Sequence, residues 1–385
     1  MEGKEKTHVL VLSFSRLSAD PRVHRQIGLL ARHFDVTAVG WDAPSVPGVS
    51  FRAVAPVNWT RAGKAAAALR LKLGLYERAY WSSAGVRDAG NALARERVDL
   101  IVANDIQALP VAVRFRGGAR ILFDAHEYAP REFEESWKWR FFFARYYDYL
   151  CRRYVPLADA ATTVCEGIAA EYRSAVGVPM TVIHNSAAYQ DLGPSATAGR
   201  PIRLVHHGGA IPSRQLETMI ETMRHLDDRY TLDFILVPSV PRYLESLKAL
   251  AAGDARIRFL PPAPMHELPG ILNAYDAGIY LLPPNNFNNR YSLPNKFFEF
   301  VQARLTIAVG PSPEMAALVR RHDLGVVAED FTPRSFARAI SGLDRERIAA
   351  HKARSHAAAR ELSFENAAAA LMQLVERTLS HPCAA

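Results

Sequence analysis

The sequence is poor in cysteine and in long apolar runs. Its 385 residues include three scattered cysteines, Cys151, Cys165 and Cys383, and no C-x-x-C pair. This pattern excludes a disulfide scaffold and indicates no zinc site. No stretch approaches the about 18 apolar residues of a membrane span, and the first apolar run is too short for a secretory signal. We therefore expect a cytoplasmic protein.

Two motifs of nucleotide-binding enzymes are also missing. The sequence contains no G-x-x-x-x-G-K-[ST], and no G-x-G-x-x-G follows an expected strand. These absences disfavour a P-loop nucleoside triphosphatase and an ordinary NAD-dependent dehydrogenase. We also find no D-x-D metal motif at a strand end.

Basic residues outnumber acidic residues only mildly. The formal net charge is +8, and residues 1–190 carry 25 basic against 19 acidic side chains. This excess is far below that of a polybasic arm, so we expect no nucleic-acid partner. The mild basic excess leaves two possibilities open: an anionic acceptor, and peripheral contact with the inner face of the membrane.

What the sequence does contain is an ordinary globular composition, with 49% hydrophobic and 22% charged residues. A single core stops growing near about 250–300 residues, so a chain of this length is expected to form two domains. Short, nearly continuous apolar runs alternate with helical patterns in the first half, which is typical of parallel strands covered by helices on both faces. The expected strands are 8–14, 35–41, 99–104, 120–124, 161–165 and 181–184, and the expected helices are 21–32, 62–95, 137–155 and 166–175.

A second alternation of strands and helices follows residues 186–200, which have the small, polar composition of a linker. We expect strands at 203–207, 231–237, 256–260, 277–282 and 306–309, with helices at 213–225, 242–252, 266–273, 294–303 and 313–321. The sequence thus predicts an α/β protein with two doubly wound, Rossmann-like domains. We assign residues 1–190 to the first domain, 201–362 to the second, and 363–385 to a C-terminal helix that is free to pack back on the first.

Loops after the strands are where a doubly wound sheet binds its ligand. Gly208 and Gly209 end an expected strand, and Arg214 follows in the first turn of the expected helix. Backbone N–H groups, a helix N-terminus and an arginine together suit a phosphate, although a glycine pair is also a plain tight turn. Lys296 and Glu299 lie three apart on a later helix, where they suit either a ligand or a surface ion pair.

Titratable side chains also follow strands of the first half. His126 and Glu127 come directly after an expected strand, so His126 is a candidate to contact a substrate hydroxyl or transfer its proton. In the first loop, Asp20 before a proline predicts a helix N-cap. The candidates for the acceptor side of a ligand-binding cleft are Arg16, Asp20, Arg22 and Glu127, with surface charge as the alternative for Arg22.

Six motifs in this order resemble the retaining GT-B glycosyltransferases of family 4, also called group 1 glycosyltransferases. They span nearly the whole chain and read S-A-D-P-R-V at 18–23, D-A-H-E at 124–127, T-V-C-E-G-I at 163–168, I-H-N at 183–185, G-G-x(4)-R at 208–214 and L-P-N-K-F-F-E at 293–299. The resemblance implies a GT-B fold, with two Rossmann-like domains facing an interdomain cleft. It also implies transfer of a sugar from a nucleotide-diphosphate donor, with retention of configuration and no metal or other cofactor.

The resemblance further implies a role for individual residues. Gly208 and Gly209 would meet the diphosphate, Arg214 and Lys296 would neutralise it, and Glu299 would bind the ribose. His126 would contact the donor sugar, so His126, Arg214 and Lys296 are the implied catalytic residues. The acceptor, whether a glycan, a lipid-linked or a small molecule, would lie on the first domain. The remaining implied donor-binding residues are Tyr291, Ser292, Leu293 and Asn295.

One position departs from the family pattern. The first glutamate of the E-x(7)-E motif would stand at 291, where this sequence has Tyr291. Donor identity is therefore open, with a UDP-sugar favoured over GDP- and TDP-sugars. Two other functions stay as alternatives: a nucleotide-sugar 2-epimerase of the same fold, and a non-catalytic module that binds a nucleotide sugar or a partner.

The segment 137–150 is dense in aromatic and basic residues. This composition suits a membrane interface and a lipid-linked acceptor. Apolar residues occupy every face of the expected helix, which equally suits core packing.

Overall fold

The computed structural model of the chain describes residues 6–56, 61–196, 201–265 and 267–380. These form two compact units. The N-terminal unit comprises the described residues up to Ile183, the segment Asn286–Asn288 and the described residues from Ala368 on, and the C-terminal unit comprises His184–Asn285 and Asn289–Ala367. Residues 197–200 of the expected linker, and Cys383, lie outside the described residues.

A parallel sheet forms the core of the N-terminal unit. It has seven strands in the order β3-β2-β1-β4-β5-β6-β7. Buried Val9 in β1 pairs with Val36 on one side and Leu100 on the other, so the central strands are covered on both faces as predicted. The strands are β1 His8–Leu12, β2 Asp35–Gly40, β3 Ser50–Ala53, β4 Leu100–Asn104, β5 Arg120–Ala125, β6 Ala160–Thr163 and β7 Thr181–Val182.

The helices around this sheet are more broken than the sequence predicts. The expected helix 62–95 is three helices, interrupted after Lys72, where Gly74 has a φ of 69°, and again at Ser82 and Ser83. β3 and α5 were not predicted. The helices are α1 Pro21–Leu30, α2 Arg61–Lys72, α3 Tyr76–Trp81, α4 Ala84–Leu93, α5 Asp105–Phe115, α6 Trp137–Phe142, α7 Ala144–Tyr154 and α8 Glu166–Val176.

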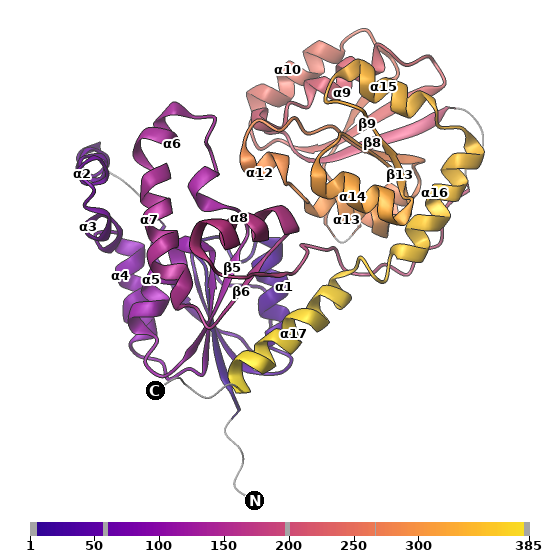
Figure 1. The fold of residues 1–385 in the computed structure, drawn as a ribbon. Coiled ribbons are helices and arrows are strands. Elements are labelled where there is room, and N and C mark those ends of the chain that lie inside the picture. The colour runs from indigo at the N-terminus through magenta and orange to yellow at the C-terminus, as the bar shows by residue number, and fades with distance from the viewer. Residues whose placement is uncertain (1–5, 57–60, 197–200, 266, 381–385) are drawn as a thin grey trace, which may run out of the picture. The chain divides into compact units, whose positions relative to one another are not determined.

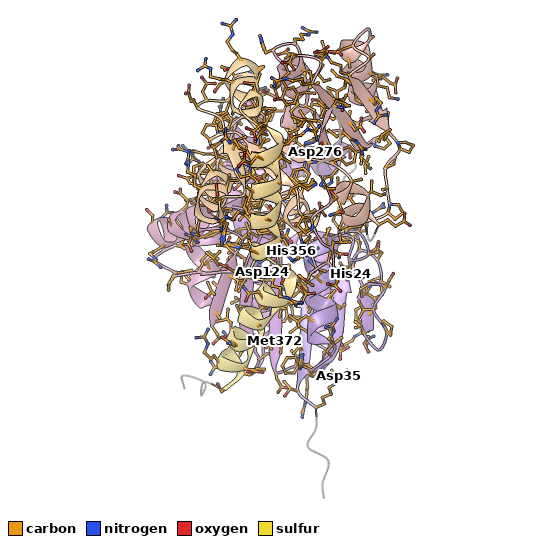
Figure 2. The ribbon with its side chains drawn as sticks, turned by 90° about the vertical axis from the view of Figure 1, so that its right-hand side faces the viewer. His24, Asp35, Asp124, Asp276, His356 and Met372 are labelled. Carbon is orange, nitrogen blue, oxygen red and sulfur yellow. The ribbon has the colours of Figure 1, made fainter. Side chains whose placement is uncertain are left out.

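The two ends of the N-terminal sheet carry different chemistry. Figure 2 labels Asp35, which begins β2 at the lower end of the sheet, and Asp124, which lies near the carboxyl end of β5. The strand order reverses between β1 and β4, where ligands of doubly wound sheets bind. The site residues predicted in this unit all follow β1 or β5 at this carboxyl edge.

The C-terminal unit repeats the plan with six parallel strands in the order β10-β9-β8-β11-β12-β13. Its core lies between β8, β9 and the helices that cover them, with Leu204, Phe234 and Phe336 fully buried (Figure 1). The strands are β8 Ile202–Gly209, β9 Tyr230–Val237, β10 Ile257–Leu260, β11 Ala277–Tyr280, β12 Thr306–Val309 and β13 Gly325–Val327.

Several later elements were not predicted, namely β13, α12, α15 and α16. The helices after β8 are α9 Glu217–Met223, α10 Pro241–Ala251, α11 Leu268–Asn273, α12 Phe287–Arg290, α13 Asn295–Gln302, α14 Pro313–His322, α15 Pro333–Ser341, α16 Arg345–Ala358 and α17 Phe364–Ser380. In the part of the chain that the structure describes, no helix combines the length and the apolar composition of a membrane span.

Candidate functional site

The glycine pair of the C-terminal unit lies inside β8. The strand continues to Gly209, so Gly208 pairs with Leu236 in the last rungs of the sheet and does not form the tight turn that was the alternative interpretation. Gly208 has a φ of 118°, a conformation that residues with a Cβ rarely adopt. Glycine therefore lets the strand end in a conformation that brings other groups close to the backbone.

Arg214 reaches this strand end from a 3₁₀ turn over Pro212–Arg214. The prediction that Arg214 lies in the first turn of an α-helix is wrong, because Gln215 is left-handed with a φ of 47° and α9 begins only at Glu217. The left-handed residue separates the turn from the helix. The Arg214 guanidinium folds back and donates a hydrogen bond of 3.2 Å to the Gly209 carbonyl.

Lys296 reaches the same place from the first turn of α13. Its side chain is buried, with Nζ 3.3 Å from His206 Nε2 and 4.1 Å from the centroid of the Tyr280 ring. A Cβ on Gly208 would lie 3.3 Å from Lys296 Nζ and 3.5 Å from Arg214 Nη1. The two cationic side chains thus converge on one glycine.

No carboxylate among the described residues forms an ion pair with Lys296 or Arg214. Burial, reinforced by the charge of Arg214, lowers the pKa of Lys296 well below its ordinary value, and Glu299 only partly opposes this. The same burial and cations lower the pKa of His206. Uncompensated positive charge beside exposed backbone is suited to binding an anion.

Glu299 lies one turn after Lys296 and is 13% exposed. Its Oε2 is 3.3 Å from His207 Nε2, an atom that is buried without a hydrogen bond among the described residues. Burial and the nearby cations lower the pKa of His207, so this histidine is neutral near pH 7. The sequence prediction assigned no role to His206 or His207, although both come directly before the glycine pair.

The remaining predicted donor residues lie around the start of α13. Tyr291, Ser292 and Leu293 form the connection from α12, and Leu293 is buried. Asn295 has a buried side-chain Oδ1 that accepts no hydrogen bond within the described parts of the chain. Tyr291, which stands at the first position of E-x(7)-E, has the Arg290 guanidinium 5.5 Å from its ring centroid.

In the N-terminal unit, Arg22 is buried, which contradicts the surface-charge alternative. It was assigned to the cleft or the surface, but its side chain is 9% exposed and forms a two-pronged ion pair with Asp124, at 2.9 Å and 2.6 Å. It also donates to the Ile183 carbonyl. Pairing with Arg22, together with other hydrogen bonds, outweighs burial and lowers the pKa of Asp124 far below its ordinary value. The pair connects α1 to β5 and fixes the base of the site.

His126 lies next to this pair, 19% exposed, with both ring nitrogens engaged. Nδ1 is 3.3 Å from Asp105 Oδ2, and Nε2 is 3.1 Å from Asn104 Oδ1. Burial opposes protonation, but the negative charges of Asp105 and Asp124 outweigh it and raise the pKa of His126 to about 9. His126 is therefore a cation near neutral pH and is suited to donate a proton or a hydrogen bond.

Asp105 is a site residue that the sequence prediction missed. It follows β4 and begins α5 with a φ of 61°, which is unusual for a residue other than glycine. Its Oδ1 accepts a hydrogen bond of 2.9 Å from the His126 backbone N–H. The pair Asn104-Asp105 at the end of a buried strand was the available signal, because the neighbouring strand β5 ends in His126.

The other predicted residues of this unit are exposed or half-buried. Glu127 is exposed, but the surrounding protein and the charge of Asp105 raise the pKa of its carboxyl to about 7. Asp20 accepts a hydrogen bond from the Val23 backbone N–H, which confirms the predicted N-cap of α1. Arg16 is exposed in the preceding loop. In the described residues, no group of three or more His, Cys, Asp or Glu side chains is arranged to hold a metal ion.

Comparison with known proteins shows a family similarity for part of the chain and the fold of the whole. Residues 22–187 match the profile of the family described as Glycosyltransferase Family 4. No curated protein sequence matches the chain.

Solved structures similar to the chain cover nearly all of it. Sucrose-phosphate synthase from Thermosynechococcus elongatus has a TM-score of 0.74 at 14% identity, covering 97% of this chain and 99% of that chain. HepE from Anabaena in complex with UDP and glucose has 0.69 at 13%, covering 98% and 100%. The UDP-forming trehalose-phosphate synthase from Burkholderia vietnamiensis has 0.69 at 14%, covering 97% and 100%. The chain thus has the two-domain GT-B fold of glycosyltransferases, and its residues 22–187 are similar to Glycosyltransferase Family 4.

Proposed function

We propose that the protein is a glycosyltransferase that moves a sugar from a nucleotide-diphosphate donor to an acceptor hydroxyl. The observation that carries this proposal is the convergence of buried Lys296 and partly buried Arg214 on Gly208, where no carboxylate of the described residues forms an ion pair with either side chain. Departure of a nucleoside diphosphate places negative charge on the leaving group, and fixed cations stabilise that charge best in the transition state. The two side chains are suited to this task.

We propose a UDP-sugar as the donor and Glu299 as the acceptor of hydrogen bonds from the ribose. The solved structures of HepE with UDP, and with UDP and glucose, support the choice of nucleotide. The Glu299 carboxylate is held beside neutral His207 one helical turn from Lys296, which suits a sugar hydroxyl next to the diphosphate.

We further propose that the reaction retains configuration and needs no metal ion, because the side-chain cations take the place of a metal in neutralising the leaving group. In the N-terminal unit, the His126 imidazolium would assist the reaction as a hydrogen-bond or proton donor. The acceptor would bind to the carboxyl edge of this unit's sheet, near exposed Glu127.

Incubation of the purified chain with UDP-, GDP- and TDP-sugars and cell-extract acceptors tests the proposal. We expect release of UDP together with a new glycoside, unchanged by a metal chelator, and NMR of the product should show the anomeric configuration of the donor. Release of UDP with a C2-inverted free sugar would instead establish an epimerase. Binding of UDP-sugars without any turnover would establish a non-catalytic module.

Glu299→Ala should raise the KM for the donor by about 10- to 100-fold, because a hydrogen bond to a charged group is lost. The rate at saturating donor should change less. Glu245→Ala, which removes an exposed carboxylate on α10, is the matched control. Near-normal donor KM in Glu299→Ala would contradict the assignment of the ribose site.

A further inference from the structure

The N-terminal unit exposes large apolar side chains on α6. Trp137 is 63% exposed and Phe141 is 57% exposed, and no residue of this helix is buried. The two lie four positions apart and hence on one face of the helix. Trp137 and Phe141 are therefore not packed into the core, so core packing does not explain this face of the segment 137–150.

The inner face of the same segment accounts for its folding. The Trp139 ring stacks on Phe143 with centroids 5.2 Å apart and on Tyr147 at 5.1 Å. These contacts anchor α6 to α7 without using Trp137 or Phe141. The outer row is thus not needed to hold the helix in place.

A second exposed apolar row lies on α2, which packs against α6. Leu69 is 57% exposed and Leu73, in the turn that ends the helix, is 62% exposed. Both helices lie toward the top of the N-terminal unit in the view of Figure 1. Exposed apolar side chains gathered on two packed helices indicate an interaction site.

Basic residues accompany both rows. Residues 63–73 contain Lys64, Arg70 and Lys72, residues 136–147 contain Lys138, Arg140 and Arg145, and neither stretch contains an acidic residue. Three glutamates precede α6, and two of them are compensated within the protein, while Glu135 is exposed and accepts a hydrogen bond from Asn286. Glu134 forms an ion pair of 2.6 Å with Arg131, and burial raises the pKa of Glu132 to about 8.

We propose that α2 and α6 form a docking surface for a bilayer with anionic headgroups. We call it the aromatic–basic surface and define it by Leu69, Lys72, Leu73, Trp137, Lys138 and Phe141. Tryptophan, phenylalanine and leucine enter the headgroup region, while long basic side chains reach the negative phosphates. A protein partner of opposite charge would suit the lysines, but the union of basic charge with exposed Trp and Phe favours a lipid interface. This inference does not depend on the proposed sugar transfer.

Sedimentation of the full chain with lipid vesicles tests it directly. We expect binding to vesicles of phosphatidylcholine mixed with phosphatidylglycerol, weakening at high salt, and little binding to phosphatidylcholine alone. Trp137→Ser with Phe141→Ser, and separately Lys72→Glu with Lys138→Glu, should each weaken partitioning by at least about tenfold. Trp137→Phe should retain binding.

Matched controls keep the test specific. Leu157→Ser removes a side chain that is 47% exposed elsewhere on the same unit, and Arg242→Glu reverses an exposed charge on α10. Both should bind like the wild type. All variants should have the circular dichroism spectrum and the unfolding temperature of the wild type, which shows that they are folded.

Three results would overturn the proposal. One is equal binding to neutral and anionic vesicles, and another is unchanged binding of the surface variants. The third is absence of vesicle binding. In that case, the protein should be tested for a dimer that forms with rising concentration. If Trp137→Ser with Phe141→Ser abolishes such a dimer, the surface binds a second copy of the chain.

Discussion

Lys296 is a buried cation whose neighbours do not neutralise it. Its ammonium lies beside His206 and the Tyr280 ring, and Arg214 adds a second positive charge. A buried charge of this kind destabilises the folded chain until an anion binds. The residue is therefore better explained by ligand binding than by stability.

Lys296→Met should separate these two effects. We expect the turnover rate to fall by about 100-fold, because a group that stabilises the leaving diphosphate is lost. The unfolding temperature of the free protein should rise by about 2–4 °C, since an apolar side chain of similar size replaces the cation. Kinetics and thermal unfolding measure both. Lys248→Met, an exposed lysine paired with Glu245, is the control, and normal turnover in Lys296→Met would contradict the assignment.

Asp105→Asn tests how His126 is held in the cationic form. Asparagine tolerates the positive φ of this position, so the backbone should be unchanged. Loss of the charge should lower the pKa of His126 from about 9 toward its ordinary value, and the alkaline limb of the pH–rate profile should shift with it. NMR titration of the imidazole measures the pKa. Asp159→Asn, which removes a carboxylate paired with arginines elsewhere in the unit, should leave this titration unchanged.

At the scale of elements, the end of β8 combines an unusual backbone with close neighbours. Gly208→Ala should lower stability by about 1–2 kcal/mol through backbone strain, and it should also weaken UDP binding because a Cβ would crowd Lys296. Gly253→Ala separates the two causes, since its φ is 91° but nothing lies near its Cβ. The control should lose stability and keep its affinity in calorimetry. Equal loss of UDP affinity in both variants would show that the strand end is not a binding site.

The elements show how far the sequence could predict this structure. Buried parallel strands such as β1 and β4 produce continuous apolar runs in the sequence. The alternation of these strands with helices along the chain could therefore be predicted. Breaks such as Phe143 between α6 and α7, or Gln215 before α9, depend on single backbone conformations that apolar periodicity does not report.

The candidate site was predictable where a motif fixes the spacing, as for Gly208 and Lys296. The site was not predictable where its residues come from two separate strands that pair in the sheet. Asp105 follows β4 and His126 follows β5, and only the pairing of these strands reveals their contact. The ion pair of Arg22 was not predictable for the same reason, because its partner Asp124 lies 102 positions away.

At the scale of the whole molecule, the two units should respond oppositely to pH. In the N-terminal unit, the pKa values of His126 and Glu132 are raised, to about 9 and about 8. Their contributions to stability are present below the unfolded pKa values and are lost as the pH rises through the folded ones. In the C-terminal unit, the pKa values of Lys296 and His206 are lowered, so their contributions are lost as the pH falls.

We therefore expect that raising the pH from about 6.5 to about 9 weakens the N-terminal unit and strengthens the C-terminal unit. Hydrogen exchange, corrected for the intrinsic rate, measures protection in β5 and β8 separately. Protection should fall in β5 and rise in β8, and Lys296→Met should reduce the rise. A change of the same sign in both strands would contradict the opposite shifts.

The grouping of Ala368 and the described residues after it with the N-terminal unit bears on synthesis. The first long segment of this unit ends at Ile183, so the ribosome must add about 180 further residues before the last segment emerges. At about 5–20 residues per second, the wait is about 10–40 s. Meanwhile the nascent unit lacks the part of α17 that is grouped with it, and apolar surface left exposed in that interval is a target for chaperones.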